Sequence, residues 1–382
     1  MRTKTKKWVW QHEDYPRFPY QKEELVEIIA QIEYNRGLLE GVSKLFGKED
    51  IDAARMDALV EEAIHTSLIE GEHLRRESVR SSVRKKLDVT FRYAEDDSTR
   101  RSDALVEVLI DCNTNGEPVS VERLHGWHNA FFVEGYDVLN PIRVAAFRTT
   151  DDMEVVSGPI GQERVHYRAV PQDRIEEDIT ALLAWCNTSR ENAYIKSALA
   201  HLWFVIIHPY DDGNGRIARA LTDYLLSRIS PSSAKLYSIS QAINHDRKGY
   251  YAILEQTTNL IRNRQYDFTP WLKWHLQTVN HAMTTALEVI EETIQKTRFW
   301  DRCRDKPLND RQRKVLKKIF EHGGTKFEGG IHTRKYISIA KTSRATAVRD
   351  LNQLVEYGCI RRIEGSAGRS VRYEVVVDDR GG

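Results

Sequence analysis

Apolar side chains recur at three- and four-residue intervals through most of this chain. Two such stretches, NAYIKSALAHLWFVII at 192–207 and RIARALTDYLLSRI at 216–229, lie close together and predict two buried helices. Further helical patterns occur at residues 25–39 and about 53–70, and in the segments ALVEVLIDC and VERLHGWHNAFF. The pattern therefore predicts a mainly α-helical protein.

A polar segment, HPYDDGNGRIAR at residues 208–219, joins the two buried helices. Pro209 lacks the N–H that a helix interior needs, so we expect the first helix to end at His208. The glycine-rich residues that follow open the second helix, and the unpaired backbone N–H groups at such a helix start bind anions. The sequence therefore predicts an anion site between the two helices.

The charged side chains of this segment agree with an anion site. Arg216 and Arg219 fall in the first turn of the second helix, where each cation costs about 0.3–1 kcal/mol unless an anion lies nearby. Asp212 offers an oxygen ligand suited to Mg²⁺, and His208 can act as a base near neutral pH. Asp-Gly and Asn-Gly also occur in ordinary turns, but the coincidence of these groups favours phosphoryl or nucleotidyl transfer. No Gly-Lys-Ser/Thr follows, which excludes a Walker A loop.

The same segment resembles the signature of the Fic family, His-Pro-Phe-x-(Asp/Glu)-Gly-Asn-Gly-Arg-x-x-Arg, with Tyr210 in place of Phe. Fic proteins typically transfer AMP from ATP to a Ser, Thr or Tyr hydroxyl of a protein. The resemblance implies that His208 is the general base and that Asp212 holds Mg²⁺. It also implies the phosphate contacts, which are an anion hole of Gly213, Asn214 and Gly215, with Arg216 on the α- and β-phosphates and Arg219 on the γ-phosphate.

Two further segments gain a meaning from this resemblance. Short β-rich runs on either side of a Gly/Pro turn predict a hairpin over 155–167, which fits an ordinary surface hairpin or the flap that docks the target segment in Fic proteins. The flap residues expected to contact a target are Val155, Val156, Ser157, Gly158, Pro159, Ile160 and Gly161. The segment HDRKGYYAILEQTTN resembles the part of Fic proteins that covers the adenine. Tyr250, Tyr251 and Leu254 are its candidate base contacts, although core packing explains them as well.

Glu70 continues the apolar stripe of the predicted helix at 53–70. A carboxylate on a core-facing stripe needs a cationic partner, unless the helix ends at Gly71 and leaves Glu70 in water. The run TSLIEG at 66–71 resembles the inhibitory helix of Fic proteins, (Ser/Thr)-x-x-x-Glu-(Gly/Asn). In that family the glutamate pairs with the second signature arginine, here Arg219.

The last 82 residues form a separate predicted domain. The segment RCRDKPLNDRQ is expected to be a linker. Three helices are expected to follow, the first at RKVLKKIF and the last at about 343–357, and then a hairpin around a glycine-containing turn. This order resembles a winged helix. Residues 301–382 carry 19 Lys and Arg against 11 Asp and Glu, a net charge of +8, while the rest of the chain carries −7. DNA binding and a protein-binding or dimerising module both fit this pattern.

Composition changes this picture little. The 382 residues carry a net charge of +1, with 41% hydrophobic and 30% charged residues, as in ordinary globular proteins. The four cysteines are scattered without a CxxC pair, which argues against a zinc site or a disulfide framework. We find no signal-peptide core and no apolar run near the signature long enough to span a bilayer, so we expect a cytoplasmic protein without membrane contact.

The sequence therefore predicts three regions: an inhibitory helical region at 1–100, a Fic catalytic core at 101–300 and a winged helix at 301–382. The predicted activity is protein adenylyl transfer from ATP with Mg²⁺, to a target protein or to the chain itself, held off by Glu70. One alternative is removal of AMP by the same site, with Glu70 orienting water. Another is a DNA-binding regulator whose Fic core senses a nucleotide.

Overall fold

The computed structural model describes most of the chain. The described residues are 6–45, 48–87, 96–133, 142–151, 153–157, 164–229, 235–321, 327, 329–366 and 371–377. At residues 45, 48–50, 156, 157 and 164 the backbone is described and the side chain is not. The contacts divide the chain into two compact units, Met1–Ala286 and Leu287–Gly382.

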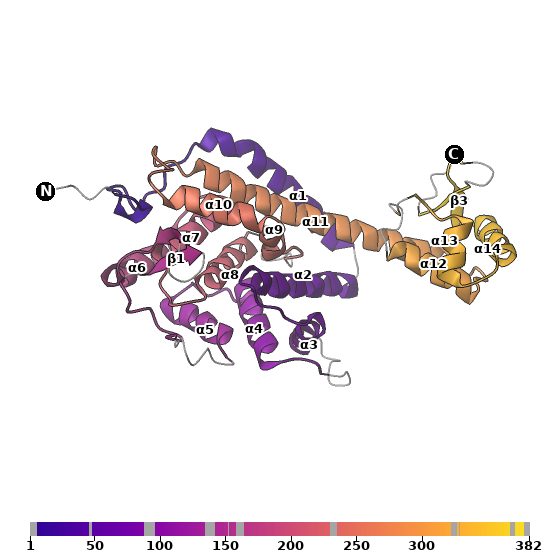
Figure 1. Ribbon diagram of the computed structural model, residues 1–382, viewed down its shortest axis with the longest axis horizontal. Coiled ribbons are helices and arrows are strands. Elements are labelled where there is room, and N and C mark those ends of the chain that lie inside the picture. The colour runs from indigo at the N-terminus through magenta and orange to yellow at the C-terminus, as the bar shows by residue number, and fades with distance from the viewer. Residues whose placement is uncertain are drawn as a thin grey trace. The chain divides into compact units, whose positions relative to one another are not determined.

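The first unit is an assembly of α-helices with one small β-hairpin (Figure 1). Its helices are α1 (Val26–Leu45), α2 (Lys48–Ile69), α3 (Arg76–Leu87), α4 (Arg100–Thr114), α5 (Val121–Phe131), α6 (Ile175–Thr188), α7 (Ala193–Ile207), α8 (Asn214–Ser227), α9 (Ile239–His245), α10 (Arg247–Thr258) and the first part of α11 (Thr269–Arg302). The hairpin consists of β1 (Glu154–Ser157) and β2 (Arg164–Arg168). The predicted mainly α-helical fold with a small hairpin is confirmed. No described helix is both long and apolar enough to cross a membrane.

Helix α8 lies at the centre of this unit. It packs against α7, α4, α2, α5 and α9, and the predicted stripe of Ile217, Leu221 and Leu225 is buried. The first turn of α8 is buried as well, since Asn214 is 3% exposed. The N-terminal end of α8 therefore begins inside the protein, where its unpaired N–H groups are shielded from bulk water.

A buried polar cluster joins α2 and α8 to the segment before α9. The Glu62 carboxylate on α2 accepts hydrogen bonds from Ser238 Oγ at 2.7 Å and from Ser240 N at 3.0 Å. Close by, Lys235 forms an ion pair with Asp223 of α8. Burial, together with the negative charge of Glu62, raises the pKa of Asp223 to about 7. The position of α2 against α8 thus depends on buried charges as well as on apolar packing.

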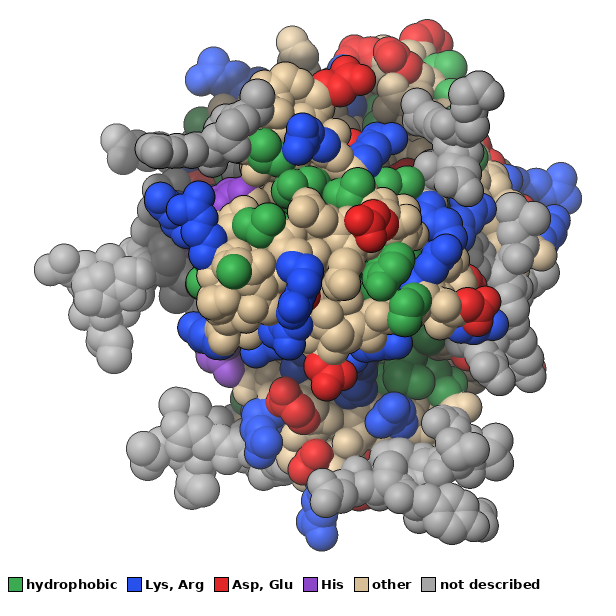
Figure 2. Space-filling model, turned by 90° about the vertical axis from the view of Figure 1, so that its right-hand side faces the viewer, with side chains coloured by type: hydrophobic (Ala, Val, Ile, Leu, Met, Phe, Trp, Pro, Cys, Tyr) green, Lys and Arg blue, Asp and Glu red, His purple; other side chains and the backbone are tan. Residues whose placement is uncertain are grey.

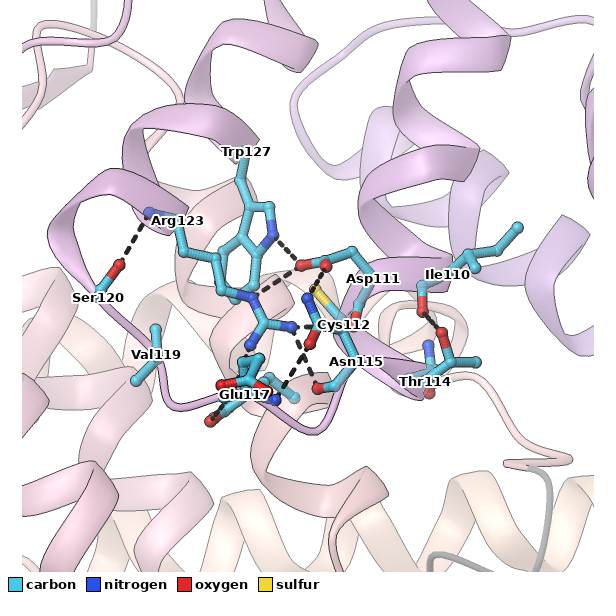
Figure 3. A network of polar contacts seen from close by, with 12 residues as sticks. Ile110, Asp111, Cys112, Thr114, Asn115, Glu117, Val119, Ser120, Arg123 and Trp127 are labelled. Carbon is cyan, nitrogen blue, oxygen red and sulfur yellow. Dashed lines mark hydrogen bonds and ion pairs between the residues drawn. The ribbon is translucent and has the colours of Figure 1, made fainter.

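A second polar network fixes the connection between α4 and α5 (Figure 3). Arg123 Nε donates to Asp111 Oδ2 at 2.8 Å, and its terminal nitrogens donate to the carbonyl oxygens of Asp111, Glu117 and Asn115. Trp127 Nε1 donates to the same carboxylate at 2.7 Å. These bonds satisfy carbonyl groups at the end of α4 and set the direction of α5, which carries side chains that contact the 208–215 loop.

The first turn of α4 lies before the predicted helical segment ALVEVLIDC and was not predicted. Helix α4 begins at Arg100 because the Thr99 side chain accepts from Ser102 N, which caps the helix. Helix α3 was not predicted either. Several of its buried positions are serines, including Ser82, whose hydroxyl bonds to that of Ser102 at 2.8 Å, so its apolar stripe is weak.

Besides the end of α11, the described residues of the second unit form three helices and a two-stranded antiparallel sheet. They are α12 (Asp310–Phe320), α13 (Thr333–Ala340), α14 (Arg344–Glu356), β3 (Ile360–Arg362) and β4 (Tyr373–Val375). Ser343 caps α14 by accepting from Thr346 N, and Gly358 follows the helix with a φ of 69°. The order of elements is the predicted one, whereas the winged-helix assignment itself stays a prediction.

Two of the scattered cysteines meet in the core of this unit. The Cys303 and Cys359 sulfur atoms lie 3.1 Å apart, and both residues are buried as free thiols. They are 56 positions apart in the chain, so no sequence motif joins them. The hydrogen bond from the Cys359 thiol is the main reason that the pKa of Cys303 is lowered to about 7.

Candidate functional site

The His208 backbone ends α7 in an unusual conformation. Its φ of 50° and ψ of 60° are left-handed, which is costly for a residue other than glycine and sends the chain sharply into the loop. Its Nδ1 lies 3.3 Å from the carbonyl oxygen of Val205. Because a carbonyl can only accept, Nδ1 carries the proton and Nε2 keeps its lone pair. Burial lowers the pKa of His208 to about 4, so the ring is neutral at physiological pH.

Arg148 holds this conformation in place. Its side chain is 1% exposed and donates from Nε to the carbonyl oxygen of His208 at 2.8 Å and from Nη2 to that of Val170 at 2.5 Å. It also donates to the carbonyl of Thr150, and its own backbone N–H donates to the carbonyl of Pro209 at 2.9 Å. This role was not predicted, because a single arginine in FRTTDD belongs to no recognisable sequence pattern.

The loop between α7 and α8 is closed by its own side chains. Asn214 Nδ2 donates to the carbonyl of Tyr210 at 2.8 Å, while Tyr210 N donates to Asn214 Oδ1 at 3.0 Å. The Tyr210 ring is fully buried and stacks on His128, whose Nε2 lies 3.1 Å from the carbonyl oxygen of Asp212. Gly213 has a φ of 79°, and a Cβ there would lie 3.0 Å from the Phe132 ring. Both the backbone and the space at this position therefore require glycine.

A cavity of about 790 Å³ opens over this loop. Most of the predicted site residues line it, namely Glu70, Val155, His208, Asp212, Gly213, Asn214, Gly215, Arg219, Tyr250, Tyr251 and Leu254. The structure thus brings together a neutral histidine, a carboxylate, the N-terminal end of a helix and a buried guanidinium. Such a cavity can hold an anionic ligand next to a base.

Glu70 and Arg219 form an ion pair at the edge of this cavity. Glu70 Oε1 lies 2.7 Å from Arg219 Nη2, and the Glu70 side chain is 29% exposed against 2% for Arg219. Burial acts to raise the pKa of Glu70, but the Arg219 charge outweighs it and the pKa is lowered. A Cβ on Gly215 would lie only 2.5 Å from Glu70 Oε1, so the carboxylate sits directly against the first turn of α8. Glu70 therefore occupies an anion position, as a core-facing carboxylate was expected to do.

Thr66 also contacts this arginine. Arg219 Nε donates to Thr66 Oγ1 at 2.8 Å and Nη2 donates to the Thr66 carbonyl at 3.1 Å. Among the described residues, Arg219 Nη1 is buried and has no hydrogen-bond partner. A buried guanidinium nitrogen without a partner is costly, so this end of the cavity is built to receive a further acceptor.

Arg216, which the resemblance assigns to the α- and β-phosphates, does not lie beside Arg219 in the cavity. Its side chain is 5% exposed and is not among those that line the cavity in the described part of the chain. The guanidinium lies over the rings of Phe131 and Phe132, 5.2 and 4.7 Å from their centres, and Nη1 is 3.3 Å from Glu72. The two arginines lie three residues apart on α8, as the spacing predicts, but their guanidinium groups point in different directions because each contacts different neighbours.

Asp212 was predicted to hold Mg²⁺. Its Oδ1 accepts the backbone N–H of Gly213 at 2.6 Å, and the side chain borders the cavity. The described residues contain no group of three or more side chains suited to bind a metal ion. A single carboxylate still fits Mg²⁺, because this ion usually takes one or two protein carboxylates together with water and substrate phosphates.

The hairpin lies where the flap was expected. Val155 of β1 pairs with Tyr167 of β2, and Val156 pairs with Val165, so the register of the hairpin shifts between Val155 and Val156. Ser157 pairs through its backbone with Arg164, whereas Gly158, Pro159, Ile160 and Gly161 lie outside the described residues.

The candidate base contacts differ in their surroundings. Tyr250 is 2% exposed and its hydroxyl bonds to His201 at 2.9 Å, so it is largely a core residue that presents one side to the cavity. Leu254 is 9% exposed and lines the cavity. Tyr251 is 44% exposed and is therefore the most open of the three to a ligand.

Known proteins resemble both parts of the first unit. Residues 118–226 match the family model for the Fic/DOC family, and residues 8–89 match a domain of unknown function, DUF4172. A curated relative, uridine 5'-monophosphate transferase of Xanthomonas campestris pv. campestris (strain 8004), is 26% identical over 121 residues. That match covers 30% of this chain and 22% of the relative, so it compares only a small part of that protein.

Solved structures share the fold at low sequence identity. A Fic family protein from Desulfovibrio desulfuricans G20 has a TM-score of 0.55 at 18% identity, covering 96% of this chain and all of that one. A Fic domain containing signaling protein from Bacteroides thetaiotaomicron VPI-5482 has a TM-score of 0.51 at 18% identity, covering 68% of this chain and 97% of that one. The match to the family model and the shared fold agree with the geometry of the 208–219 loop. Residues 118–226 of the chain therefore form a Fic domain of the Fic/DOC type.

Proposed function

We propose that this protein is a nucleotidyltransferase that moves AMP from ATP to a hydroxyl side chain of a protein, which includes the chain itself as a possible target. The observation that carries the proposal is the convergence of His208, Asp212, the glycine loop and Arg219 on one cavity. A base, a carboxylate, helix N–H groups and a buried guanidinium are the groups that transfer of a nucleotide from a triphosphate requires.

The chemistry follows from the position of each group. The target hydroxyl oxygen attacks the α-phosphorus, the bond to the pyrophosphate leaving group breaks, and the hydroxyl proton passes to Nε2 of His208. Because Nδ1 carries the proton that it donates to the Val205 carbonyl, Nε2 of the neutral ring is unprotonated and can accept the hydroxyl proton. The N–H groups at the start of α8 would stabilise the phosphate oxygens, and Arg219 Nη1 would gain the acceptor that it lacks. Mg²⁺ held by Asp212 and the phosphates would neutralise charge on the leaving group.

The hairpin would position the target. Strand β1 pairs with β2 along one edge, and Val155 on β1 borders the cavity. An extended target segment added beside β1 would be held by backbone hydrogen bonds, which are independent of side-chain identity. Its hydroxyl would then point toward His208.

Two donor nucleotides deserve a direct comparison. The intact signature favours ATP, whereas the named activity of the Xanthomonas relative is transfer of uridine 5'-monophosphate. The base end of the cavity, near Tyr251 and Leu254, is lined by aromatic and apolar side chains, which stack on any base. We propose ATP as the donor and take UTP as the competing choice.

The ion pair of Glu70 with Arg219 would hold the enzyme in an inactive state. The carboxylate occupies the position next to Gly215 that a phosphate oxygen would need, and it neutralises the arginine that would bind the triphosphate. A triphosphate bound beside Glu70 would be displaced, and a shift of about 1 Å can cost on the order of 10²-fold in rate. Removal of AMP by the same site remains an alternative activity, in which Glu70 orients a water molecule.

The test is incorporation of label from nucleotides carrying a radioactive α-phosphate. The full chain as wild type, Glu70→Gly and Glu70→Gly/His208→Ala would be incubated with Mg²⁺ and with labelled ATP, UTP, GTP or CTP, with and without a protein extract. We expect strong protein labelling from ATP by Glu70→Gly, little by wild type and none above background by the double variant. No label from any nucleotide with Glu70→Gly would overturn the proposal. Wild-type release of AMP from the labelled product would establish the removal activity instead.

The C-terminal unit supports a second, separable proposal, which is binding to duplex DNA. Arg344 and Arg349 are exposed on α14, the first of them next to the helix cap. Figure 2 shows Lys and Arg side chains spread over the end of the molecule that faces the viewer, with acidic and apolar side chains between them. If phosphate contacts drive binding, the affinity of the full chain for mixed-sequence duplex should fall steeply as salt is added. No binding at low salt would identify this unit as a protein-contact module.

A further inference from the structure

A second carboxylate lies two residues beyond Glu70 and faces the other signature arginine. Glu72 Oε2 and Oε1 lie 3.3 and 3.4 Å from Arg216 Nη1, and Oε2 also forms an ion pair with Arg101 of α4. Glu72 therefore stands between two arginines. Neither the predicted signature nor the predicted inhibitory pattern includes this residue.

The end of α2 explains why both carboxylates reach α8. Gly71 has a φ of 81°, its N–H bonds to the carbonyl of Leu68 at 3.0 Å, and the N–H of Glu72 bonds to the carbonyl of Ser67 at 2.9 Å. This pair of bonds is the Schellman ending of a helix, with glycine in the left-handed position. The ending reverses the chain directly after Glu70. The next side chain but one, Glu72, is thereby directed to the same helix.

Charge at this helix end is unfavourable without the arginines. The C-terminal end of a helix carries partial negative charge, and two further carboxylates there repel it and each other. Arg219 and Arg216 remove this cost by pairing with one carboxylate each. Arg216 and Arg219 thus each have one carboxylate partner from the residues that follow α2, before any ligand binds.

The surroundings of Arg216 show that it is held away from the cavity. Its guanidinium rests on the faces of Phe131 and Phe132, and its Nε is buried without a hydrogen-bond partner among the described residues. The contacts to Glu72 are long for hydrogen bonds between charged groups, which usually measure 2.7–2.9 Å. An arginine with one weak ion pair and an unsatisfied nitrogen can be released at modest cost.

We propose that Glu72 is a second restraining residue, which holds Arg216 on the Phe131–Phe132 shelf until a triphosphate draws it into the cavity. This inference rests on the proposed nucleotidyl transfer, because it assigns Arg216 a phosphate-binding state. Glu72 touches no reacting atom and acts through Arg216, so it is a positioning residue. Activation then requires two exchanges, one at Glu70 and one at Glu72.

Replacing Arg101 should change triphosphate affinity in the opposite direction to replacing Glu72. It competes with Arg216 for the same carboxylate, so its removal leaves Glu72 free to bind Arg216 more tightly. Arg101→Gln should therefore weaken triphosphate binding in the wild-type background. In a Glu72→Gln background the same change should have little effect. A simple loss of nearby positive charge would weaken binding equally in both backgrounds.

The experiment measures the affinity of the full chain for inorganic tripolyphosphate by calorimetry, since this probe has no base and no transferable nucleotide. The variants are wild type, Glu72→Gln, Glu72→Asp and Glu70→Gly/Glu72→Gln, with Glu61→Gln as the matched control. Glu61 lies on α2 and likewise pairs with an arginine, Arg76, at 2.5 Å, but this arginine is not one of the two signature arginines. We expect Glu72→Gln to bind about 5- to 20-fold more tightly than wild type, with Glu72→Asp close to wild type and Glu61→Gln unchanged.

Each outcome decides between the proposals. Unchanged or weaker binding by Glu72→Gln, with an unfolding temperature close to that of wild type, would show that Glu72 does not restrain Arg216. If Glu72→Gln instead fails to fold, the Glu72→Asp variant is decisive, because it keeps a carboxylate that can still pair with Arg216. Tripolyphosphate binding by Glu72→Asp that is more than 20-fold tighter than wild type, or that is absent, would contradict the restraint. Tighter binding by Glu72→Gln without any nucleotide transfer by Glu70→Gly would support the restraint of Arg216 while the transferase proposal fails. In an active Glu70→Gly background, Glu72→Gln should lower KM for ATP and leave kcat nearly unchanged.

Discussion

Replacing Arg148 with lysine tests whether the left-handed conformation of His208 is held from outside. The guanidinium donates to the carbonyl groups of Thr150, Val170 and His208 at once, and these lie on separate segments of the chain. A lysine ammonium keeps the charge and the approximate length, but it is a single point and cannot span the three acceptors. Arg148→Lys therefore removes the geometry and keeps the charge.

The size of the effect follows from the bonds that are lost. Hydrogen bonds to a charged group contribute about 1.5–3 kcal/mol each, so the loss of two of the three should destabilise the first unit by roughly 3–6 kcal/mol. For a unit of this size that is a fall in Tm of the order of 10 °C. Without Arg148, the His208 backbone can relax from its φ of 50°, and a displaced base should lower kcat about 10²-fold.

The assay compares kcat for nucleotide transfer in the Glu70→Gly background with and without Arg148→Lys, together with thermal unfolding. Arg123→Lys is the matched control, because Arg123 also donates to three backbone carbonyl groups, and these belong to Asp111, Asn115 and Glu117 rather than to the 208–219 loop (Figure 3). Both variants should lose stability, and only Arg148→Lys should lose kcat. Equal kcat in the two variants at a temperature where both are folded would refute the assigned role of Arg148.

Three further predictions follow from individual side chains. Because burial lowers the pKa of His208 to about 4, the transfer rate of Glu70→Gly should be level from about pH 6 to about pH 8 and fall only below about pH 5; an inflection near pH 6.5 would contradict this. Burial raises the pKa of Asp223 to about 7, so the folded state keeps a proton that the unfolded state, with a pKa of about 3.9, releases. The free energy of unfolding should therefore fall as pH rises between these values, and urea titrations of Asp223→Asn should lose that slope. Diamide should join Cys303 and Cys359, seen by mass spectrometry as the loss of two hydrogens, and should stabilise the second unit by about 2–4 kcal/mol; Cys359→Ser should show neither effect.

Much of the site could be predicted because its backbone depends on local chemistry. Pro209 ends α7, Gly213 is required by its φ of 79°, and apolar spacing places α7 and α8 on either side of the loop. The core-facing position of Glu70 predicted a cationic partner, and the structure supplies Arg219. The helix end, the glycine and the core-facing position of Glu70 are each encoded within a few residues, where sequence patterns are informative. The choice of Arg219 as the partner of Glu70 came from the family resemblance.

The features that were missed depend on contacts between distant segments. Arg148 acts through carbonyl groups, which every residue has, so no sequence pattern identifies its partners. The direction of Arg216 depends on Phe131, Phe132 and Glu72, which helical spacing along α8 cannot reveal. Helical periodicity predicts the position of a side chain's Cα and Cβ atoms, whereas contacts with distant segments determine the direction of its charged end.

The paired bonds between Asn214 and Tyr210 have a consequence for the thermodynamics of ligand binding. They close the loop between α7 and α8 without a ligand, so ligand binding would not have to order it. Fixing a flexible residue costs about 1–2 kcal/mol, and this loop has already met that cost during folding. Under the proposed function, the end of the cavity that would hold the phosphates is therefore ordered in advance. Substitutions near Tyr251 and Leu254 can change which base is accepted without rebuilding the part that holds the charge, and a single fold can in this way acquire different nucleotide donors.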